Sequence, residues 1–143
     1  RIAVFHNGRV VRVGSPEEIY NQPGSGFVAG FIGESNIIRK KDFNRLGLSH
    51  IDAELVCIRP QDIRIMEPCQ DGNTNGWIAG KIIQMEFRGN SMMYRVMVET
   101  VTIKVLVLNT DTSRNLHPGE AVPLVIPVSA VKNLTSQGAA CEN

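Results

Sequence analysis

The chain has 143 residues, 43% of them hydrophobic and 20% charged, which is typical of one small folded domain or of one domain with a short extension. Its 15 lysines and arginines nearly balance its 14 aspartates and glutamates, so the net charge does not favour nucleic acid or an anionic membrane as a partner. No apolar run reaches the roughly 20 residues of a membrane-spanning helix.

The first elements expected along the chain are a β-hairpin and a short helix. Two β-prone runs, Ile2–Phe5 and Arg9–Val13, flank His6-Asn7-Gly8, and Asn-Gly is a strong signal for a tight turn. Ser15-Pro16-Glu17-Glu18 then favours a helix start, because the serine can cap the helix, the proline suits its first turn, and the second glutamate can bond back to the capping residue.

A second short helix is expected after the glycine-rich break at Gly24-Ser25-Gly26. Four apolar residues recur at helical spacing, and Gly33 follows as a stop: Phe27, Val28, Phe31 and Ile32. Such a stripe is typical of a face that docks onto another domain or onto a second copy of the chain. We therefore take these four residues as a candidate interface.

A change of composition divides the chain near residue 54. Residues 37–53 are polar, with a basic cluster at Arg39-Lys40-Lys41, and they predict a linker between residues 1–36 and a β unit over 54–135. A tail, 136–143, follows. Six β-prone runs separated by turn residues make up the second unit: Glu54–Arg59, Ile63–Met66, Trp77–Phe87, Met92–Glu99, Thr102–Leu108 and Val122–Ile126.

Six short strands, most of them with one apolar face, predict a small β-barrel. Gly80, inside the longest run, marks a place where that strand can bend. The fold class expected for the whole chain is therefore mainly β, a small barrel preceded by a hairpin and short helices.

Two polar turns are candidate sites. Arg59 and Asp62 flank Pro60-Gln61, and a turn there would let them pair or cap backbone groups, a structural role that we favour over ligand binding. Arg88-Gly89-Asn90-Ser91 combines an arginine, a glycine and two small polar side chains, which together can hold an oxyanion. An ordinary bulged hairpin turn is the simpler role for that segment.

The sequence lacks the residue patterns that several kinds of catalytic or binding site require. ATP hydrolysis needs a G-x-x-x-x-G-K-[ST] loop, and no glycine-rich run here has the lysine, so we expect no ATPase and no cofactor in this chain. His6, His50 and His117 lie far apart, and Cys57, Cys69 and Cys141 are widely spaced, so neither a metal site nor a disulfide framework is expected. Aromatic and methionine side chains around Tyr94 lack interleaved basic residues, which favours core packing over a nucleic-acid platform.

Three motifs follow one another at the start of the chain: R-I-x-V-x-x-x-G over Arg1–Gly8, G-x-P-x-E-I-Y-x-x-P over Gly14–Pro23 and F-V-A-x-F-I-G-x-x-N over Phe27–Asn36. In this order they resemble the end of the nucleotide-binding domain of importer-type ABC transporter ATPases. The second unit resembles the TOBE domain of the same family, in Ile58-Arg59-Pro60-Gln61-Asp62-Ile63, Gly80-Lys81-Ile82, Phe87-Arg88-Gly89 and Pro118–Val122.

The resemblance implies an oligonucleotide-binding-like barrel that helps two ATPase subunits to dimerise and regulates solute import. It also implies partners: the chain's own nucleotide-binding domain with ATP and magnesium, a second copy, and membrane permease subunits that hold it at the cytoplasmic side of the inner membrane. Alternative functions are a module for an oxyanion such as molybdate or sulfate and, less favoured, a single-strand nucleic-acid barrel. The 20 or so residues after Asn36 are too few for the family's usual early strands, so either the barrel is smaller or a partner chain completes it.

Overall fold

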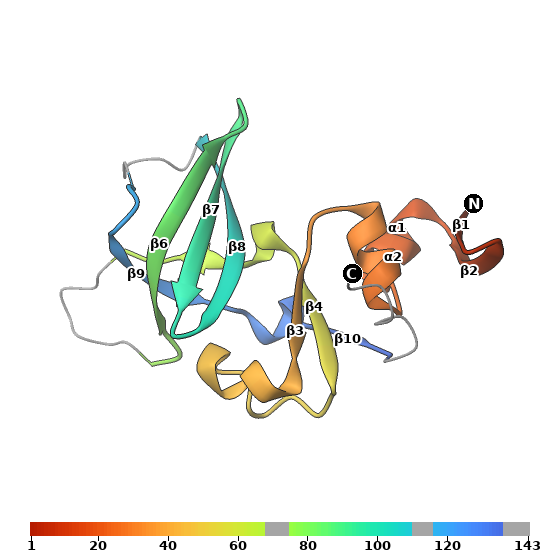
Figure 1. The fold of residues 1–143 in the computed structure, drawn as a ribbon, viewed down its shortest axis with the longest axis horizontal. Helices are drawn as coiled ribbons and strands as arrows, with labels where there is room; N and C mark the ends of the chain where they lie inside the picture. The colour runs from red at the N-terminus through yellow and green to blue at the C-terminus, as the bar shows by residue number, and fades with distance from the viewer. Residues whose placement is uncertain (68–74, 110–115, 136–143) are drawn as a thin grey trace.

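A computed structural model of the chain describes residues 1–67, 75–109 and 116–135. It contains three antiparallel sheets and two short α-helices (Figure 1). The hairpin and the helices lie at one end of the molecule, a five-stranded sheet lies at the other, and a three-stranded sheet lies between them. Parts of the sequence-based predictions fall outside the described residues: Cys69, Cys141, the turn Asp71-Gly72-Asn73 and the tail 136–143.

The predicted hairpin and first helix are confirmed. β1 (Ile2–His6) pairs with β2 (Arg9–Gly14), and the turn uses positive φ angles at Asn7 and Gly8, as the twist of a tight hairpin requires. In α1 (Pro16–Asn21), Ser15 accepts a hydrogen bond from the Glu18 N–H, and the Glu18 carboxylate accepts one from the Ser15 N–H. This reciprocal cap sets the start of the helix.

The second helix, α2 (Gly26–Ile32), begins after Ser25, whose hydroxyl caps it, and ends before Gly33. Its apolar residues do not form the single docking face that their spacing predicts. Val28 is buried against Val4 of β1 and Ile19 of α1, with Phe27 and Ile32 partly buried beside them, whereas Phe31 is 64% exposed. The hairpin and α1 already cover most of the stripe, so only part of it is available to a partner.

The prediction of a linker over 37–53 is wrong. This segment contains β3 (Asn36–Arg39) and the 3-10 helices η1 (Lys40–Asp42) and η2 (Asn44–Leu46). Phe43, Leu46 and Leu48 are buried in the main core. The signal was missed because tight turns place apolar residues inward at spacings that match neither a strand nor an α-helix.

The three-stranded sheet has β4 (Leu55–Ile58) at its centre, between β3 and β10 (Lys132–Leu134). All four residues of β4 are buried, as expected for a central strand that is covered on both faces. After Arg59, β4 is followed by the 3-10 helix η3 (Pro60–Asp62), which leads into the five-stranded sheet. The two strands that the sequence did not predict, β3 and β10, are the short partners of β4.

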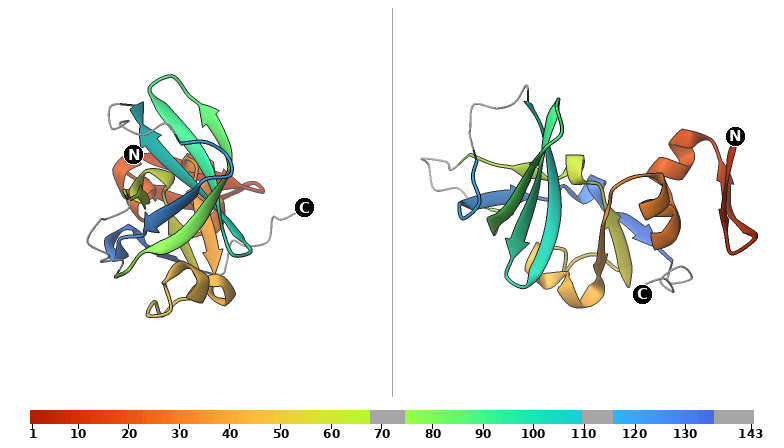
Figure 2. Two further views of the ribbon diagram at one scale, coloured as in Figure 1. Left: turned by 90° about the vertical axis from the view of Figure 1, so that its left-hand side faces the viewer. Right: turned by 45° about the horizontal axis from the view of Figure 1, so that its top comes forward.

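The five-stranded sheet has the order β5-β9-β6-β7-β8. Its strands are β5 (Arg64–Ile65), β6 (Ile78–Phe87), β7 (Ser91–Val98), β8 (Val101–Leu108) and β9 (Ala121–Val125), with the 3-10 helix η5 (Val128–Ala130) leading on to β10. Each strand matches one of the predicted runs within one or two residues. The sheet curls into a half-barrel (Figure 2), and the mainly β class is confirmed.

The core fills the inside of this curl. Gly80 lies where β6 passes close to its neighbours, because a Cβ atom there would come within 2.5 Å of Val96 Cγ1 and 3.1 Å of Leu124 Cδ1. The predicted place for a bend is therefore a close approach of β6 to its neighbours. Tyr94, Met93 and Val96 of β7 are buried, so the aromatic and methionine residues of this strand largely serve packing, as favoured from the sequence.

Candidate functional site

The joint between the helical segment and the half-barrel is built around Arg59, which follows β4 and is only 4% exposed. Its guanidinium lies 4.1 Å from the ring centroid of Tyr20. It donates hydrogen bonds to four carbonyl oxygens and one hydroxyl of the helical segment: Tyr20 O at 3.1 Å, Ala29 O at 2.9 Å, Gly33 O at 3.1 Å, Glu34 O at 3.2 Å and Ser35 Oγ at 2.5 Å. The carbonyl groups at the end of α2 lack partners within the helix, and a cation there satisfies them and opposes the helix dipole.

This geometry corrects one part of the prediction for Arg59 and Asp62. The turn is present, since the Asp62 N–H donates to the Arg59 carbonyl oxygen at 3.0 Å. Among the described residues, however, no ion pair joins the two side chains, because the guanidinium points to the helical segment instead. Arg59 acts by capping backbone groups, which was the other role considered for this turn.

A second contact of the joint is made by Asn36, a buried residue at the start of β3. Its side-chain Nδ2 donates to the carbonyl oxygen of Lys104 at 2.8 Å, and its Oδ1 accepts from the Lys104 N–H at 2.7 Å. The amide therefore bonds the backbone of β8 as a neighbouring strand would. It connects the three-stranded sheet to the edge of the five-stranded sheet.

A charged cluster lies beside it and engages the predicted oxyanion turn. Glu34 pairs with Arg88 at 2.7 Å and with Lys104 at 3.2 Å, and Arg88 also bonds Glu86 at 3.1 Å. The hydrogen bond from Arg88, more than that from Lys104, holds the pKa of Glu34 below its ordinary value, although partial burial opposes the shift. The arginine chosen as an anion ligand is therefore already held by two carboxylates.

The rest of that turn has the geometry of a hairpin connection between β6 and β7. Gly89 has φ +82°, the Arg88 N–H donates to the Ser91 carbonyl oxygen at 2.9 Å, and Ser91 Oγ lies 3.3 Å from Asn90 Oδ1. Arg88, Gly89, Asn90 and Ser91 are thus brought together as one turn. Their binding of an oxyanion stays a prediction.

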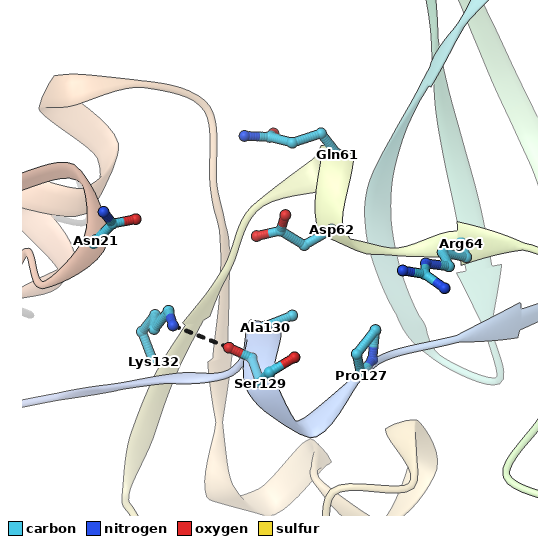
Figure 3. Close-up of a pocket in the computed structure, with 8 residues that line it drawn as sticks. All are labelled: Asn21, Gln61, Asp62, Arg64, Pro127, Ser129, Ala130 and Lys132. Atoms are coloured by element: carbon cyan, nitrogen blue, oxygen red, sulfur yellow. Dashed lines mark hydrogen bonds between the residues drawn. The ribbon is translucent and has the colours of Figure 1, made fainter. Parts of the chain in front are cut away.

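A polar pocket of about 340 Å³ opens next to the joint (Figure 3). It lies between α1, η3 and the segment that leads to β10, with Asp62 and Gln61 on one side and Asn21 on another. Gln61 Nε2 donates to the Tyr20 hydroxyl, and Lys132 Nζ donates to the Ser129 carbonyl oxygen at 2.9 Å. The remaining lining residues are Arg64, Pro127 and Ala130. The pocket therefore borders the Arg59 joint with polar groups of both regions.

The described part of the chain holds no group of three or more histidine, cysteine or acidic residues that could bind a metal ion. None of the helices described is long and apolar enough to cross a membrane. The groups that the joint offers are hydrogen-bonding and ion-pairing ones.

The partners of Arg59 and the role of Asn36 were not predicted, although one signal was available for Arg59. Arg59 follows four apolar residues without a break, and a charged residue that continues a buried strand requires buried partners. The identity of those partners, 24 to 39 positions earlier in the chain, depends on tertiary packing.

Comparison with known proteins places this geometry in a family context. Residues 56–131 match the TOBE domain family. The chain is 34% identical over 126 residues to the spermidine/putrescine import ATP-binding protein of Mycoplasma capricolum, which covers 77% of this chain and 34% of that protein. It is 32% identical over 139 residues to the protein of the same description from Clostridium acetobutylicum, covering 87% of this chain and 37% of that protein.

A relative with a different named solute shows similar agreement. The sulfate/thiosulfate import ATP-binding protein of Synechocystis is 30% identical over 124 residues, which cover 82% of this chain and 34% of that protein. The chain thus spans about a third of the length of the curated relatives that it matches.

Proposed function

This chain belongs to the TOBE domain family and corresponds to the C-terminal part of ABC importer ATP-binding subunits, and from that premise we propose that it helps two such subunits to pair and passes regulatory signals to their ATP-binding domains. The matched region is an accessory domain and not a catalytic ATPase domain. ATP and magnesium belong, in this proposal, to a nucleotide-binding domain that precedes the region. The solute passes through membrane permease subunits, at whose cytoplasmic side the ATP-binding subunits lie.

The Arg59 joint is the observation that carries this proposal. A rigid connection between an accessory domain and an ATP-binding domain can carry a signal from one to the other. The guanidinium bonds Tyr20 in α1 and the carbonyl groups that end α2, so the half-barrel and both helices are held in one arrangement. A rotation of the barrel would then move the helices with it.

The surface of the helical segment supports docking onto a nucleotide-binding domain. Phe5, Val10 and Val13 of the hairpin are 61%, 51% and 49% exposed, and Phe31 of α2 is 64% exposed. Clusters of exposed large apolar side chains mark interaction sites. Of the candidate interface residues Phe27, Val28, Phe31 and Ile32, Phe31 is thus the one that offers most of its surface to a partner.

The experiment uses the longer ATP-binding subunit that carries these residues, assembled with its membrane subunits in lipid vesicles. Replacing Arg59→Lys removes the planar fork that reaches several carbonyl groups at once while keeping the charge. We expect solute import to fall by at least about fivefold, the lower end of typical coupling between sites. ATP hydrolysis by the isolated subunit should stay at the wild-type rate.

Arg64→Lys is the matched control, because Arg64 is an exposed arginine on β5 close to the same pocket (Figure 3). It should import solute as the wild type does. A folded Arg59→Lys subunit that imports solute at the wild-type rate would show that the joint does not transmit the signal.

A further inference from the structure

The outer half of β6 has a strand neighbour on one side only. Residues Ile78–Lys81 pair with β9, and that ladder ends at Ile82, whose N–H donates to the Glu120 carbonyl oxygen at 2.9 Å and whose carbonyl oxygen accepts from the Gly119 N–H at 2.7 Å. Beyond Ile82, β6 pairs with β7 alone within the described ranges. The tip of the β6–β7 hairpin projects past the other strands (Figures 1 and 2).

The hydrogen-bond pattern identifies which backbone groups this edge offers. The Arg88 N–H donates to the Ser91 carbonyl oxygen, and hydrogen-bonded pairs recur at every second residue of an antiparallel ladder. Glu86, opposite Met93, therefore directs its backbone groups toward β7. Met85 and Phe87 direct theirs to the free side.

The side chains at this edge are apolar and exposed. Met85 is 41% exposed and Phe87 is 69% exposed, the highest value among the large apolar residues of the described ranges. An edge strand whose backbone groups have no strand partner among the described residues, and whose side chains are apolar and exposed, invites pairing with another strand. We therefore treat this edge of β6 as an interaction surface, and its residues indicate the kind of strand that can pair with it.

We propose that β6 of a second copy pairs with this edge, antiparallel, about a two-fold axis beside Glu86. Met85 of each copy then lies opposite Phe87 of the other, so the two outward-facing residues of each strand exchange backbone hydrogen bonds reciprocally. Two contacts between methionine sulfur and an aromatic ring form at the same time, a favourable pairing. This inference rests on the proposed pairing of subunits and names the surface that makes it.

The register follows from the same two residues. An axis at Phe87 would place Met85 opposite Gly89, whose φ of +82° takes the turn out of the extended conformation. An axis at Met85 would place Phe87 opposite Ile83, next to the irregularity that lies between Ile82 and Gln84. The axis beside Glu86 is the register in which both outward-facing residues meet an outward-facing partner.

The charges of the strand are compatible with a second copy. Glu86 would lie opposite its own equivalent, and like charges directly opposite each other are unfavourable. Each Glu86, however, is already bonded by Arg88 of its own chain, at 3.1 and 3.2 Å from the two carboxylate oxygens. The intrachain pair thus neutralises the one repulsive contact at the axis.

Sedimentation equilibrium of the whole chain tests the surface. The wild type should dimerise, and Phe87→Ser should raise the dimer dissociation constant at least about tenfold, as expected for loss of a central aromatic contact. Phe31→Ser is the matched control, since Phe31 is 64% exposed but lies on α2, and it should leave the dissociation constant within about threefold, a change of less than 1 kcal/mol. Circular dichroism of each variant verifies that it is folded.

Cysteine cross-linking tests the register, with Cys69→Ser and Cys141→Ser as the background. Opposing residues of a non-hydrogen-bonded antiparallel pair have Cα atoms about 4.5 Å apart, within the range of a disulfide. Glu86→Cys should therefore form a covalent dimer on mild oxidation. Gln84→Cys should not, because the two copies of residue 84 would lie about 14 Å apart along the strands.

The outcomes separate this inference from the function on which it rests. A dimer that Phe87→Ser leaves intact, without cross-linking at residue 86, would overturn the β6 surface and leave subunit pairing in place. If Phe31→Ser disrupted the dimer and Phe87→Ser did not, the interface would lie on α2. That result would likewise overturn the β6 surface and leave subunit pairing in place. A wild type that is monomeric at every concentration would overturn both.

Discussion

The two ends of the molecule are stabilised in different ways. The half-barrel surrounds one large apolar core that extends from Ile38 to Ala130, whereas the hairpin and helices share a small cluster of Val4, Ile19 and Val28. The contact between them includes a minor apolar cluster around Ala29 and, at its centre, the hydrogen bonds of Arg59. Apolar burial tolerates small rotations, but hydrogen bonds are directional, so the polar joint is what sets the orientation of the two regions.

That difference has a consequence for stability. A cluster of three buried residues stabilises little by itself, because small units bury a small fraction of their surface. The helical end should therefore depend on the joint, while the half-barrel should depend on its own packing. The stability of the two regions can be tested separately, because replacing Arg59 should destabilise mainly the helical end and replacing Gly80 mainly the half-barrel.

The largest effect is expected for Arg59→Ala. Removing the guanidinium takes a buried charged donor away from the carbonyl groups at the end of α2, where Ser35 Oγ stays within 3.1 Å of Ala29 O and 3.3 Å of Gly33 O. The loss of several hydrogen bonds to a charged group suggests a cost of about 3 kcal/mol. Urea unfolding measures the loss, and hydrogen exchange locates it. Amides of α1 and α2 should exchange faster at urea concentrations that leave the half-barrel intact.

Arg64→Ala serves as its control, because this exposed arginine on β5 has the same charge and no ion pair with a described residue. It should change the unfolding free energy by no more than about 0.5 kcal/mol. If Arg59→Ala were as mild, or if all amides became less protected together, the helical end would not depend on a polar joint.

The same division explains which features the sequence predicted. The hairpin turn at Asn7 and Gly8 and the cap at Ser15 are made by residues close together in the chain, so the local sequence predicts them. The strands of the five-stranded sheet and β4 lie in runs that alternate or concentrate apolar residues, and these runs were also predicted. The TOBE resemblance added the expected barrel, and the family match over residues 56–131 agrees with it.

The features that the sequence did not predict depend on distant contacts. Asn36 bonds Lys104, 68 positions later, and Arg59 bonds residues from Tyr20 to Ser35. Residues 37–53 looked like a linker because Phe43 and Leu46 enter the core from short 3-10 turns. The partners of Arg88 could not be found for the same reason, since Glu34 is brought beside it only by the packing of the helical segment on the sheets.

A smaller effect, confined to the half-barrel, is expected for Gly80→Ala. The new Cβ would lie 2.5 Å from Val96 Cγ1 and 3.1 Å from Leu124 Cδ1, so these side chains or the strands that carry them must shift. Overpacking of this kind costs about 1–3 kcal/mol. Urea unfolding followed by Trp77 fluorescence, next to β6, should show the loss, with the protection of α1 and α2 falling only as much as the global stability.

Gly30→Ala is the comparison at the other end. Gly30 lies within α2, and a Cβ atom there meets nothing within 4 Å. Because alanine favours a helix over glycine, this variant should be neutral or up to about 1 kcal/mol more stable. A Gly80→Ala protein as stable as Gly30→Ala would mean that the curl of the sheet is loosely packed and that the half-barrel is not the rigid partner of the comparison.

The smallest effect is expected at the exposed edge of the joint, for Glu34→Gln. Arg88 and Lys104 hold the pKa of Glu34 below its ordinary value of 4.5, so the carboxylate stabilises the fold when it is ionised. A lowered pKa in the folded state gives stability that is present above the ordinary pKa and lost as the pH falls through the folded value. Because the side chain of Glu34 is 39% exposed, the contribution should be below about 1 kcal/mol.

The measurement is the free energy of unfolding in urea from pH 7 down to pH 3 for the wild type and for Glu34→Gln. The wild type should be the more stable protein at pH 7, and the difference should shrink below pH 4.5 as Glu34 takes up a proton. If the difference stayed constant down to pH 3, or were already absent at pH 7, the ion pairs of Glu34 would add nothing to the joint, which would then depend on its other hydrogen bonds and on the apolar cluster around Ala29.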